Sequence, residues 1–405
     1  MMIMMILVFS MMAHAQNATP FFADLENFRK QSLSLQTEQQ NLEAASASYL
    51  SSQFFWTPRL SLSANQTRTR LNAGATSDQN TLVADATLNL YRAGSDWNTL
   101  ESRKSAKLAQ QLQLENESLR VELRAADFIF KSIYLIQSKK IQDDLLKLKE
   151  DALRILNDRF HQGQLPLQEV RKSEVDLVQQ RNRARQAALD SLENESEIHS
   201  AFVSEIQTKS WPFQENTTPK LQSAPRVPSV EQKYWFSQAQ EQSWKAAKGG
   251  HWPTIDLSVE YQQSPIKDRD SSQWVGILQL TLPIWSQYET SAKIASAYAQ
   301  YVSSQNDFKE TQEHTKYKYE FLKQKIEVAR TNLIEAKANV EKAKELYQSI
   351  LKSFRMARLS TNDLLIEQNR LLDSQTALLL SQLSFHQTLI ETCALVGLPS
   401  STCLR

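Results

Sequence analysis

The sequence predicts a mainly α-helical protein with a small β part. Very long coiled-coil-like helices are expected to form an α-barrel, and four transmembrane β-strands per chain are expected to close as a 12-stranded barrel in a trimer. Three observations support this prediction. One long segment carries an unbroken heptad stripe, two pairs of short segments alternate polar and apolar residues, and both halves of the chain show the same order of elements.

The longest helix is predicted from the heptad stripe in the second half of the chain. No Gly or Pro occurs between Ile284 and Val396, so nothing in this stretch would interrupt a helix. At about 1.5 Å per residue, a single helix from Gln287 to Phe354 would be roughly 100 Å long. A stripe sustained over this length indicates packing against other helices. Its members are Leu322, Ile326, Ala329, Leu333, Ala336, Val340, Ala343, Tyr347, Ile350 and Phe354.

The composition favours long helices and argues against several classes of function. The 405 residues include only seven glycines, and the net charge of +1 comes from 46 basic and 45 acidic residues without a cationic block. Nucleic-acid binding therefore has no support. The six histidines are scattered, and the nearest approach to a metal-ligand pair, Glu195 with His199, is more typical of a solvated helix face. No phosphate-binding loop or nucleophile arrangement occurs, so we expect no metal, no cofactor and no enzymatic activity.

The two ends of the chain carry signals of export. Residues 1–15 are predicted to be a signal peptide, because an apolar run precedes Ala13-His14-Ala15, which fits the small-x-small pattern of a cleavage site. Near the other end, Cys393 and Cys403 either form a disulfide in an oxidising compartment or remain one buried and one exposed thiol.

The first structural repeat is assigned to residues 16–210. Thr19 and Pro20 are expected to open a helix that continues to about Ser52. A β-hairpin follows, with two strands of about ten residues around a polar loop from Arg70 to Asn80. The repeat ends with a long helix over 97–160, a break at Gly163, and a helix over 166–202.

The second structural repeat is assigned to residues 229–398, after a linker over 211–228. It is expected to contain a short helix ending at Gly249-Gly250, a second β-hairpin, the long helix, a turn and a final helix ending at Val396. Residues 399–405 form a C-terminal tail. The two halves match at an offset of about 195 residues, which indicates a tandem duplication.

The predicted hairpins are suited to a membrane. Strands of about ten residues match the nine to eleven that a tilted strand needs to cross a bilayer. Four strands cannot close by themselves, and lipid does not tolerate an open sheet edge, so three chains would be needed to make a wet barrel. Aromatic residues gather where helix meets strand and are expected at the lipid–water interface, the alternative being that they cap a soluble sheet. The residues assigned to this interface are Trp56, Tyr91, Trp97, Trp252 and Trp285.

This layout resembles the TolC-like outer-membrane efflux protein family (outer membrane factors), over essentially the whole mature chain. Each motif is short, but their order is specific. The residues that carry the resemblance are Pro58-Arg59-Leu60-Ser61-Leu62-Ser63, Leu88-Asn89-Leu90-Tyr91 with Gly94, Arg159-Phe160-His161-Gln162-Gly163, Asn362-Asp363-Leu364-Leu365 and Asn369-Arg370-Leu371-Leu372.

The resemblance implies a homotrimer in the outer membrane of a Gram-negative cell that extends into the periplasm. Its expected partners are outer-membrane lipid, a periplasmic adaptor (membrane fusion protein) and an inner-membrane pump. The implied function is a passive export duct of a tripartite efflux or type I secretion system. The alternative is a secreted periplasmic coiled-coil structural or adaptor protein.

The resemblance also assigns the two helix-to-helix turns to the periplasmic entrance. Asp363 and Glu367 are assigned to the pore entrance, where a ring of Asp363 side chains would favour cations. The alternative role for Asp363 is to stabilise its helix N-terminus by about 0.3–1 kcal/mol. Ala357 stands where the family usually has Gly. The turn and adaptor-docking residues are Gly163, Gln164, Leu165, Pro166, Ala357, Arg358 and Leu359.

Overall fold

The computed structural model has eight α-helices, one 3-10 helix and one four-stranded sheet among the residues it describes. These residues are 20–70, 76–201, 206–219, 226–266, 269–284, 288–356 and 358–404. The helices are α2 (Pro20–Gln31), α3 (Leu33–Gln53), α4 (Ser95–His161), α5 (Leu167–Ala201), α6 (Pro228–Lys248), η1 (Gly249–His251), α7 (Glu289–Arg355), α8 (Thr361–Leu395) and α9 (Ser400–Cys403). The strands are β1 (Arg59–Arg70), β2 (Thr76–Tyr91), β3 (Thr254–Ile266) and β4 (Arg269–Thr281). The predicted mainly helical fold with a small β part is confirmed.

Helix lengths recur between the two halves of the chain. Helices α4 and α7 each have 67 residues, α5 and α8 each have 35, and α3 and α6 each have 21. Hairpin, long helix, turn and helix occur in this order twice, after α2 and α3 in the first half and after α6 and η1 in the second. The exact residue limits of the two repeats stay a prediction.

Two details of the predicted elements are wrong. The first helix is broken at Ser32, whose hydroxyl accepts a hydrogen bond from the Leu35 amide at 3.4 Å and so caps α3. The strands have 12 to 16 residues, more than the ten expected. Pairing continues through polar residues such as Gln66 and Asn80 up to Arg70 opposite Thr76. The described residues of the predicted polar loop, Arg70 and 76–80, are strand, because the backbone ladder does not require apolar side chains.

The chain forms two compact units. The helical unit comprises Met1–Leu35, Asn116–Val227 and Thr315–Arg405, and the sheet unit comprises Gln36–Glu115 and Pro228–His314. The boundary falls inside α4 and inside α7, so both long helices contribute to each unit.

In the helical unit, the heptad stripe of α7 is the buried side of the helix. Eight of its ten members are less than 9% exposed, and Ala336 and Ile350 are half-buried. The equivalent stripe on α5, from Val170 to Ile198, is buried as well. Near the turns, these stripes meet in one hydrophobic cluster with residues from four helices. The cluster consists of Ala152, Leu156, Val170, Ala343, Tyr347, Phe354, Leu364 and Leu371.

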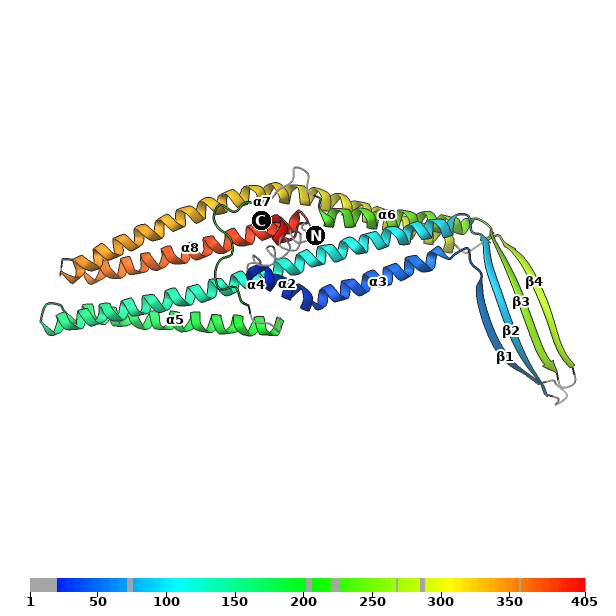
Figure 1. The fold of residues 1–405 in the computed structure, drawn as a ribbon, viewed down its shortest axis with the longest axis horizontal. Coiled ribbons are helices and arrows are strands. Elements are labelled where there is room, and N and C mark those ends of the chain that lie inside the picture. The colour runs from blue at the N-terminus through cyan, green and yellow to red at the C-terminus, as the bar shows by residue number, and fades with distance from the viewer. Residues whose placement is uncertain are drawn as a thin grey trace, which may run out of the picture. The chain divides into compact units, whose positions relative to one another are not determined.

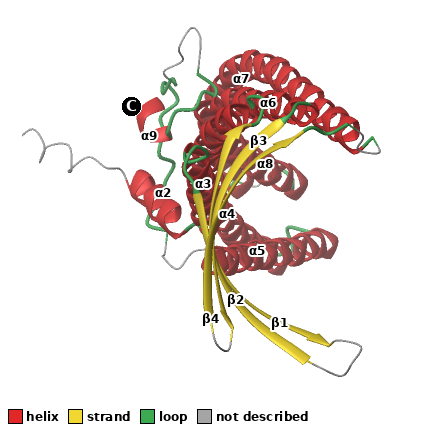
Figure 2. Ribbon diagram, turned by 90° about the vertical axis from the view of Figure 1, so that its right-hand side faces the viewer, coloured by secondary structure: helices red, strands yellow, loops and turns green. Residues whose placement is uncertain are grey.

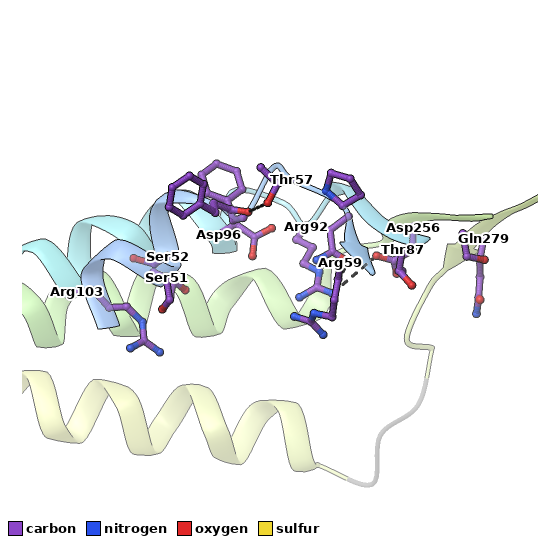
Figure 3. Close-up of a pocket in the computed structure, with 16 residues that line it drawn as sticks. Ser51, Ser52, Thr57, Arg59, Thr87, Arg92, Asp96, Arg103, Asp256 and Gln279 are labelled. Carbon is purple, nitrogen blue, oxygen red and sulfur yellow. Dashed lines mark hydrogen bonds and ion pairs between the residues drawn. The ribbon is translucent and has the colours of Figure 1, made fainter. Parts of the chain in front are cut away.

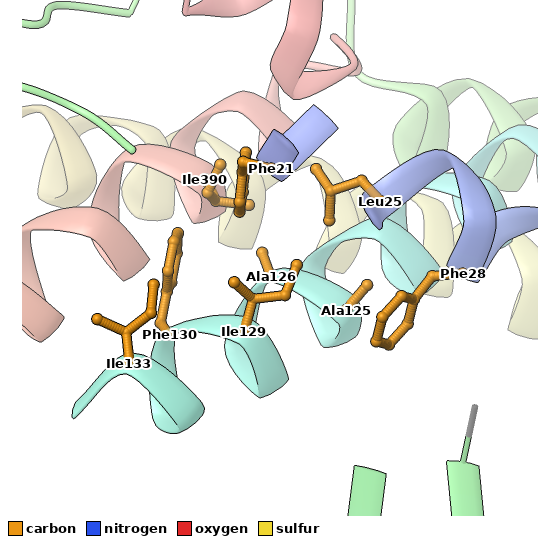
Figure 4. Packing of buried hydrophobic residues seen from close by; sticks show 9 residues of the cluster. All are labelled: Phe21, Leu25, Phe28, Ala125, Ala126, Ile129, Phe130, Ile133 and Ile390. Atoms are coloured by element: carbon orange, nitrogen blue, oxygen red, sulfur yellow. The ribbon is translucent and has the colours of Figure 1, made fainter. Parts of the chain in front are cut away.

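A second cluster holds α2 against α4 and α8 (Figure 4). The ring of Phe130 is fully buried and stacks on Phe21 of α2 with centroids 5.4 Å apart. Trp211 and Phe213, which follow α5 in the chain, pack on the same cluster. Aromatic pairs of this kind contribute beyond their buried area.

His386 of α8 extends this aromatic cluster. Its Nδ1 lies 2.7 Å from the Gln382 carbonyl oxygen, and its Nε2 lies 3.1 Å from the Phe213 carbonyl oxygen and 3.4 Å from the Phe213 amide nitrogen. The ring centroid is 4.8 Å from that of Trp211. Burial lowers the pKa of His386 to about 4, although hydrogen bonds to backbone atoms of Gln382 and Phe213 oppose this shift.

The stability of the helical unit is expected to fall by about 3 kcal/mol as the pH drops from about 6.5 to about 4. In this window, unfolded His386 binds a proton that the folded, buried ring does not accept, so acid favours unfolding. Denaturant unfolding followed by circular dichroism at several pH values measures the loss. His386→Gln should flatten this part of the profile, whereas His199→Gln, on the exposed side of α5, should leave it unchanged. An unaltered profile in His386→Gln would contradict the assignment.

The C-terminal tail is attached to the helical unit. A disulfide joins Cys393 and Cys403, with Cα atoms 5.8 Å apart, so of the two alternatives the structure has the bonded one. Both cysteines are fully buried. The Ser400 amide donates to Glu122 Oε1 of α4 at 2.7 Å, which docks α9 beside α4.

In the sheet unit, the two hairpins join into one antiparallel sheet of order β1-β2-β3-β4 (Figure 1). The strands run side by side and bow along their length (Figure 2). Pairing of β2 with β3 is regular except for one shift between Asn89 and Tyr91.

Candidate functional site

The sheet has one polar and one apolar face. Paired residues of an antiparallel sheet share a face, so the register places Asp85, Thr87, Ser258 and Glu260 on one side. The opposite side carries leucine and aromatic residues that the chain leaves exposed to an unusual degree. The most exposed are Leu60 at 76%, Leu62 at 71%, Trp274 at 73%, Leu278 at 68% and Leu280 at 67%.

The two outer strands, β1 and β4, each have one unpaired edge among the described residues. Along the described register, β1 pairs only with β2, and β4 pairs only with β3. Each outer strand therefore presents a row of backbone groups available to another chain.

The predicted interface aromatics lie where the strands meet the helices, and they are exposed. Trp56, Tyr91, Trp97 and Trp252 are between 47% and 64% exposed. Trp97 packs edge-on against Phe55 with centroids 5.6 Å apart. The fifth predicted aromatic, Trp285, lies outside the described residues.

A further aromatic pair, absent from the sequence prediction, lies towards the hairpin end of the sheet. Tyr261 and Trp274 are partners in the β3–β4 register, with ring centroids 4.8 Å apart, and they belong to the apolar face. Tyr261 is nine residues from Trp252, which corresponds to about 30 Å along an extended strand. The predicted alternation of the first arm includes Tyr261, and the alternation of the second arm, continued back from Leu278 through Gly276, would have added Trp274.

The two helix-to-helix turns have the same hydrogen-bond pattern. The Gln164 amide donates to the Arg159 carbonyl at 2.9 Å, and the Arg358 amide donates to the Ser353 carbonyl at 3.0 Å. A bond across five residues is typical of a Schellman helix end. In the first turn Gly163 supplies the required positive φ, +71°. Its counterpart in the second turn, Ala357, lies outside the described residues.

The remaining turn residues differ in their exposure. Gln164 and Arg358 donate the two turn bonds, Leu359 follows Arg358, and Pro166 precedes α5. Gln164, Pro166 and Arg358 are exposed, whereas Leu165 and Leu359 are half-buried. Leu165 packs against the cluster formed by the four helices.

The structure brings the ends of the two helical hairpins together. The Arg159 guanidinium of α4 donates to the Phe354 carbonyl oxygen of α7 and lies 4.6 Å from the centre of the Phe354 ring. Further along the helices, Lys149 is only 3% exposed and forms an ion pair with Asp176 at 2.7 Å. Its Nζ also donates to Asn369 Oδ1 at 3.3 Å, so one buried cation connects α4, α5 and α8.

The two predicted entrance carboxylates have local partners. Asp363 forms a capping box: its Oδ2 accepts from the Ser360 amide at 3.1 Å, and Ser360 Oγ accepts from the Asp363 amide at 3.2 Å. The helix-stabilising role is therefore present. Glu367, one turn later, forms an ion pair with Arg370 at 2.8 Å. Of the two, Asp363 has no cationic partner among the described residues.

Within the described ranges, no group of three or more His, Cys, Asp or Glu side chains is placed to hold a metal ion. In the same part of the chain, no helix has an apolar stretch long enough to cross a bilayer.

Neither a sequence-family model nor a curated protein matches the chain. Solved structures do match it over nearly the whole length. The CmeC outer-membrane channel of Campylobacter jejuni superimposes with a TM-score of 0.82 at 15% identity, covering 95% of this chain and 88% of that one. The VceC outer-membrane protein of Vibrio cholerae gives 0.79 at 14% identity, with 93% and 96% covered.

The MtrE outer-membrane channel of Neisseria gonorrhoeae, in its open state, gives a TM-score of 0.80 at 14% identity, with 93% of this chain and 89% of that one covered. At these identities the comparison establishes the fold. The chain has the fold of the TolC-like outer-membrane efflux channels.

Proposed function

We propose that this protein is an outer-membrane efflux duct, which assembles as a homotrimer and works passively with a periplasmic adaptor and an inner-membrane pump. The observation that carries the proposal is a sheet with one exposed apolar face, one polar face and two open edges. In lipid, unpaired edge groups cost several kcal/mol each, so open edges demand closure. Three chains would give about twelve strands around a polar lumen.

Helix α5 supports self-association as well. Beside its buried stripe it leaves a second set of apolar residues between 48% and 60% exposed. Such a patch on a helix that already packs within its own unit is suited to a neighbouring copy. The exposed residues are Leu167, Val175, Val178, Leu189 and Leu192.

A charge on the apolar face should prevent insertion. Leu62→Lys places an ammonium on the lipid side of β1, at an expected cost of about 2–4 kcal/mol if it lies near the bilayer midplane. We expect the variant to lose the trimer from outer-membrane extracts and to lose conductance in planar bilayers. The matched control is Ser63→Lys, the next residue of the same strand on the polar face, which should still insert and assemble.

A failure of the wild-type chain to enter lipid would contradict the proposed duct. A wild-type chain that stays monomeric in detergent, never enters lipid and tolerates Leu62→Lys would support a periplasmic structural or adaptor protein instead.

Asp363 is inferred to contribute negative charge at the entrance in addition to capping α8. Asp363→Asn keeps an oxygen acceptor for the cap and removes the charge, whereas Asp363→Ala removes both. Both variants should lower the cation-to-anion permeability ratio, by about twofold or more, because rings of Asp side chains favour cations. Asp363→Ala should destabilise the helix end more than Asp363→Asn, because Asn loses only the charge at the helix N-terminus whereas Ala also loses the capping-box acceptor.

Bilayer reversal potentials in a KCl gradient measure the permeability ratio. Glu367→Gln is the control, since its charge is already balanced by Arg370 and should matter less. Equal ratios in wild type and Asp363→Asn would remove Asp363 from the entrance and leave its capping role alone.

A further inference from the structure

A polar hollow of about 800 Å³ lies in the sheet unit, where the strands meet the helices (Figure 3). Its charged lining comes from several segments. Arg59 begins β1, Arg92 follows β2, Asp96 and Arg103 belong to α4, and Asp256 belongs to β3. The hollow therefore gathers three guanidinium groups and two carboxylates.

One of the three arginines already has a hydrogen-bond partner and a nearby carboxylate. Arg92 donates to Asn89 Oδ1 at 2.7 Å and lies 3.8 Å from Asp256 Oδ1. Arg59 and Arg103 are exposed and form no ion pair with any carboxylate in the described part of the chain. The other carboxylate, Asp96, is in the first turn of α4, where negative charge is balanced by the helix N-terminus. The hollow thus has an uncompensated positive charge.

Neutral hydrogen-bonding groups lie beside Arg59 on the polar face, beginning with its register partner Thr87, whose hydroxyl also donates to Asp85. Thr87, Ser258 and Gln279 line the hollow from β2, β3 and β4. Thr87 and Ser258 are register partners on the polar face, which would be the wet side of a closed barrel. A solute inside the duct would therefore have access to the guanidinium groups.

We propose that this hollow binds small multivalent anions bearing carboxylate or phosphate groups, with Arg59 and Arg103 as the binding cations. Guanidinium groups match the paired oxygens of carboxylate and phosphate, and their charge-assisted hydrogen bonds are roughly twice as strong as neutral ones. The inference rests on the proposed duct, because the arginines would then form an anion-attracting zone in its water-filled interior. This zone lies on a different unit from Asp363, whose charge has the opposite sign.

Citrate and inorganic phosphate are suitable probes, the first for carboxylates and the second for phosphates. The purified full-length protein in detergent is titrated with each probe by calorimetry, at about 0.1 M and about 1 M salt. The charge-neutralising variant is Arg59→Gln with Arg103→Gln. The matched control is Lys104→Gln with Lys293→Gln, which removes two exposed cations of the sheet unit that do not line the hollow.

Wild type and the control should bind citrate, phosphate or both, and the arginine variant should bind about tenfold more weakly. Binding should weaken at the higher salt concentration, since the Debye length falls from about 10 Å to about 3 Å. Equal binding by the arginine variant and wild type, or no binding by wild type, would overturn the inference. The single variants and their circular dichroism spectra exclude misfolding as the cause of a loss.

Planar-bilayer block separates this inference from the proposed function. If wild type conducts and the bound anion reduces its conductance, with block lost in the arginine variant, both hold. If wild type conducts and neither probe binds or blocks, the duct stands and the anion site falls. If wild type never conducts but calorimetry shows arginine-dependent binding, the site stands and the duct falls.

Discussion

Replacing Phe130 with Ala should destabilise the helical unit by about 4 kcal/mol. The ring is fully buried, stacks on Phe21 and lies 5.5 Å from the His386 ring centre, so its removal costs both transfer free energy and a cavity. Hydrogen exchange of α2 and α8 should accelerate together, because α2 and Ile390 of α8 belong to the same cluster. Denaturant unfolding measures the total loss.

Two further variants show whether the cavity is the cause. Phe130→Leu refills most of the space and should cost clearly less than Phe130→Ala. Ile136→Ala removes a residue of the same helix that is 47% exposed, and it should change stability by less than about 0.5 kcal/mol. A comparable loss in both alanine variants would show that α4 itself, rather than the cluster, is responsible.

Replacing Asp24 with Ala should cost about 3 kcal/mol and release α2. Asp24 is 3% exposed, and its Oδ2 accepts hydrogen bonds from the Thr208 amide at 3.0 Å and the Thr208 hydroxyl at 2.7 Å. The Gln207 amide also donates to it, at 3.1 Å. Truncation leaves the two Thr208 donors buried without an acceptor, and each such group costs about 1–3 kcal/mol.

Limited proteolysis is the direct measurement, since a detached α2 exposes new sites between residues 20 and 35. Asp24→Asn keeps one acceptor oxygen and should lose less than Asp24→Ala. Glu26→Ala, on the exposed side of the same helix, should behave as wild type. Resistance of Asp24→Ala to cleavage would mean that the apolar cluster alone retains α2.

Periodicity predicted the long helices well, because one face of each is buried along its length. Leu322, Leu333 and Phe354 are at most 2% exposed at the spacing from which they were identified. The positions of the strands, and the side of the sheet on which each side chain lies, could be predicted because Leu60 and Leu62 alternate with serines. What periodicity could not give is the end of each strand, where polar residues such as Gln66 continue the ladder.

Buried polar residues could not be predicted from the sequence. Lys149 reads as part of a solvated helix face, yet it is buried because Asp176 and Asn369 from two other helices reach it. Asp24 depends in the same way on Thr208, 184 residues away. Such pairings are set by tertiary contacts and leave no local pattern.

The left-handed backbone conformation at Tyr288 could not be predicted from the sequence. Gly94 has φ +74° just before α4, and Tyr288 has φ +65° just before α7. A left-handed conformation is ordinary for Gly but costs about 1–2 kcal/mol for a residue with a side chain. The tyrosine gave no turn signal, although it occupies the place of a glycine.

The equal lengths of α4 with α7 and of α5 with α8 restrict how such a protein can change size during evolution. A single inserted residue would rotate everything beyond it by about 100° and turn buried leucines towards water. An insertion of seven residues keeps the stripe in phase but displaces one turn from its counterpart by about 10 Å. Growth or shortening therefore has to come in whole heptads, added to each half of the gene in the same step or compensated soon afterwards.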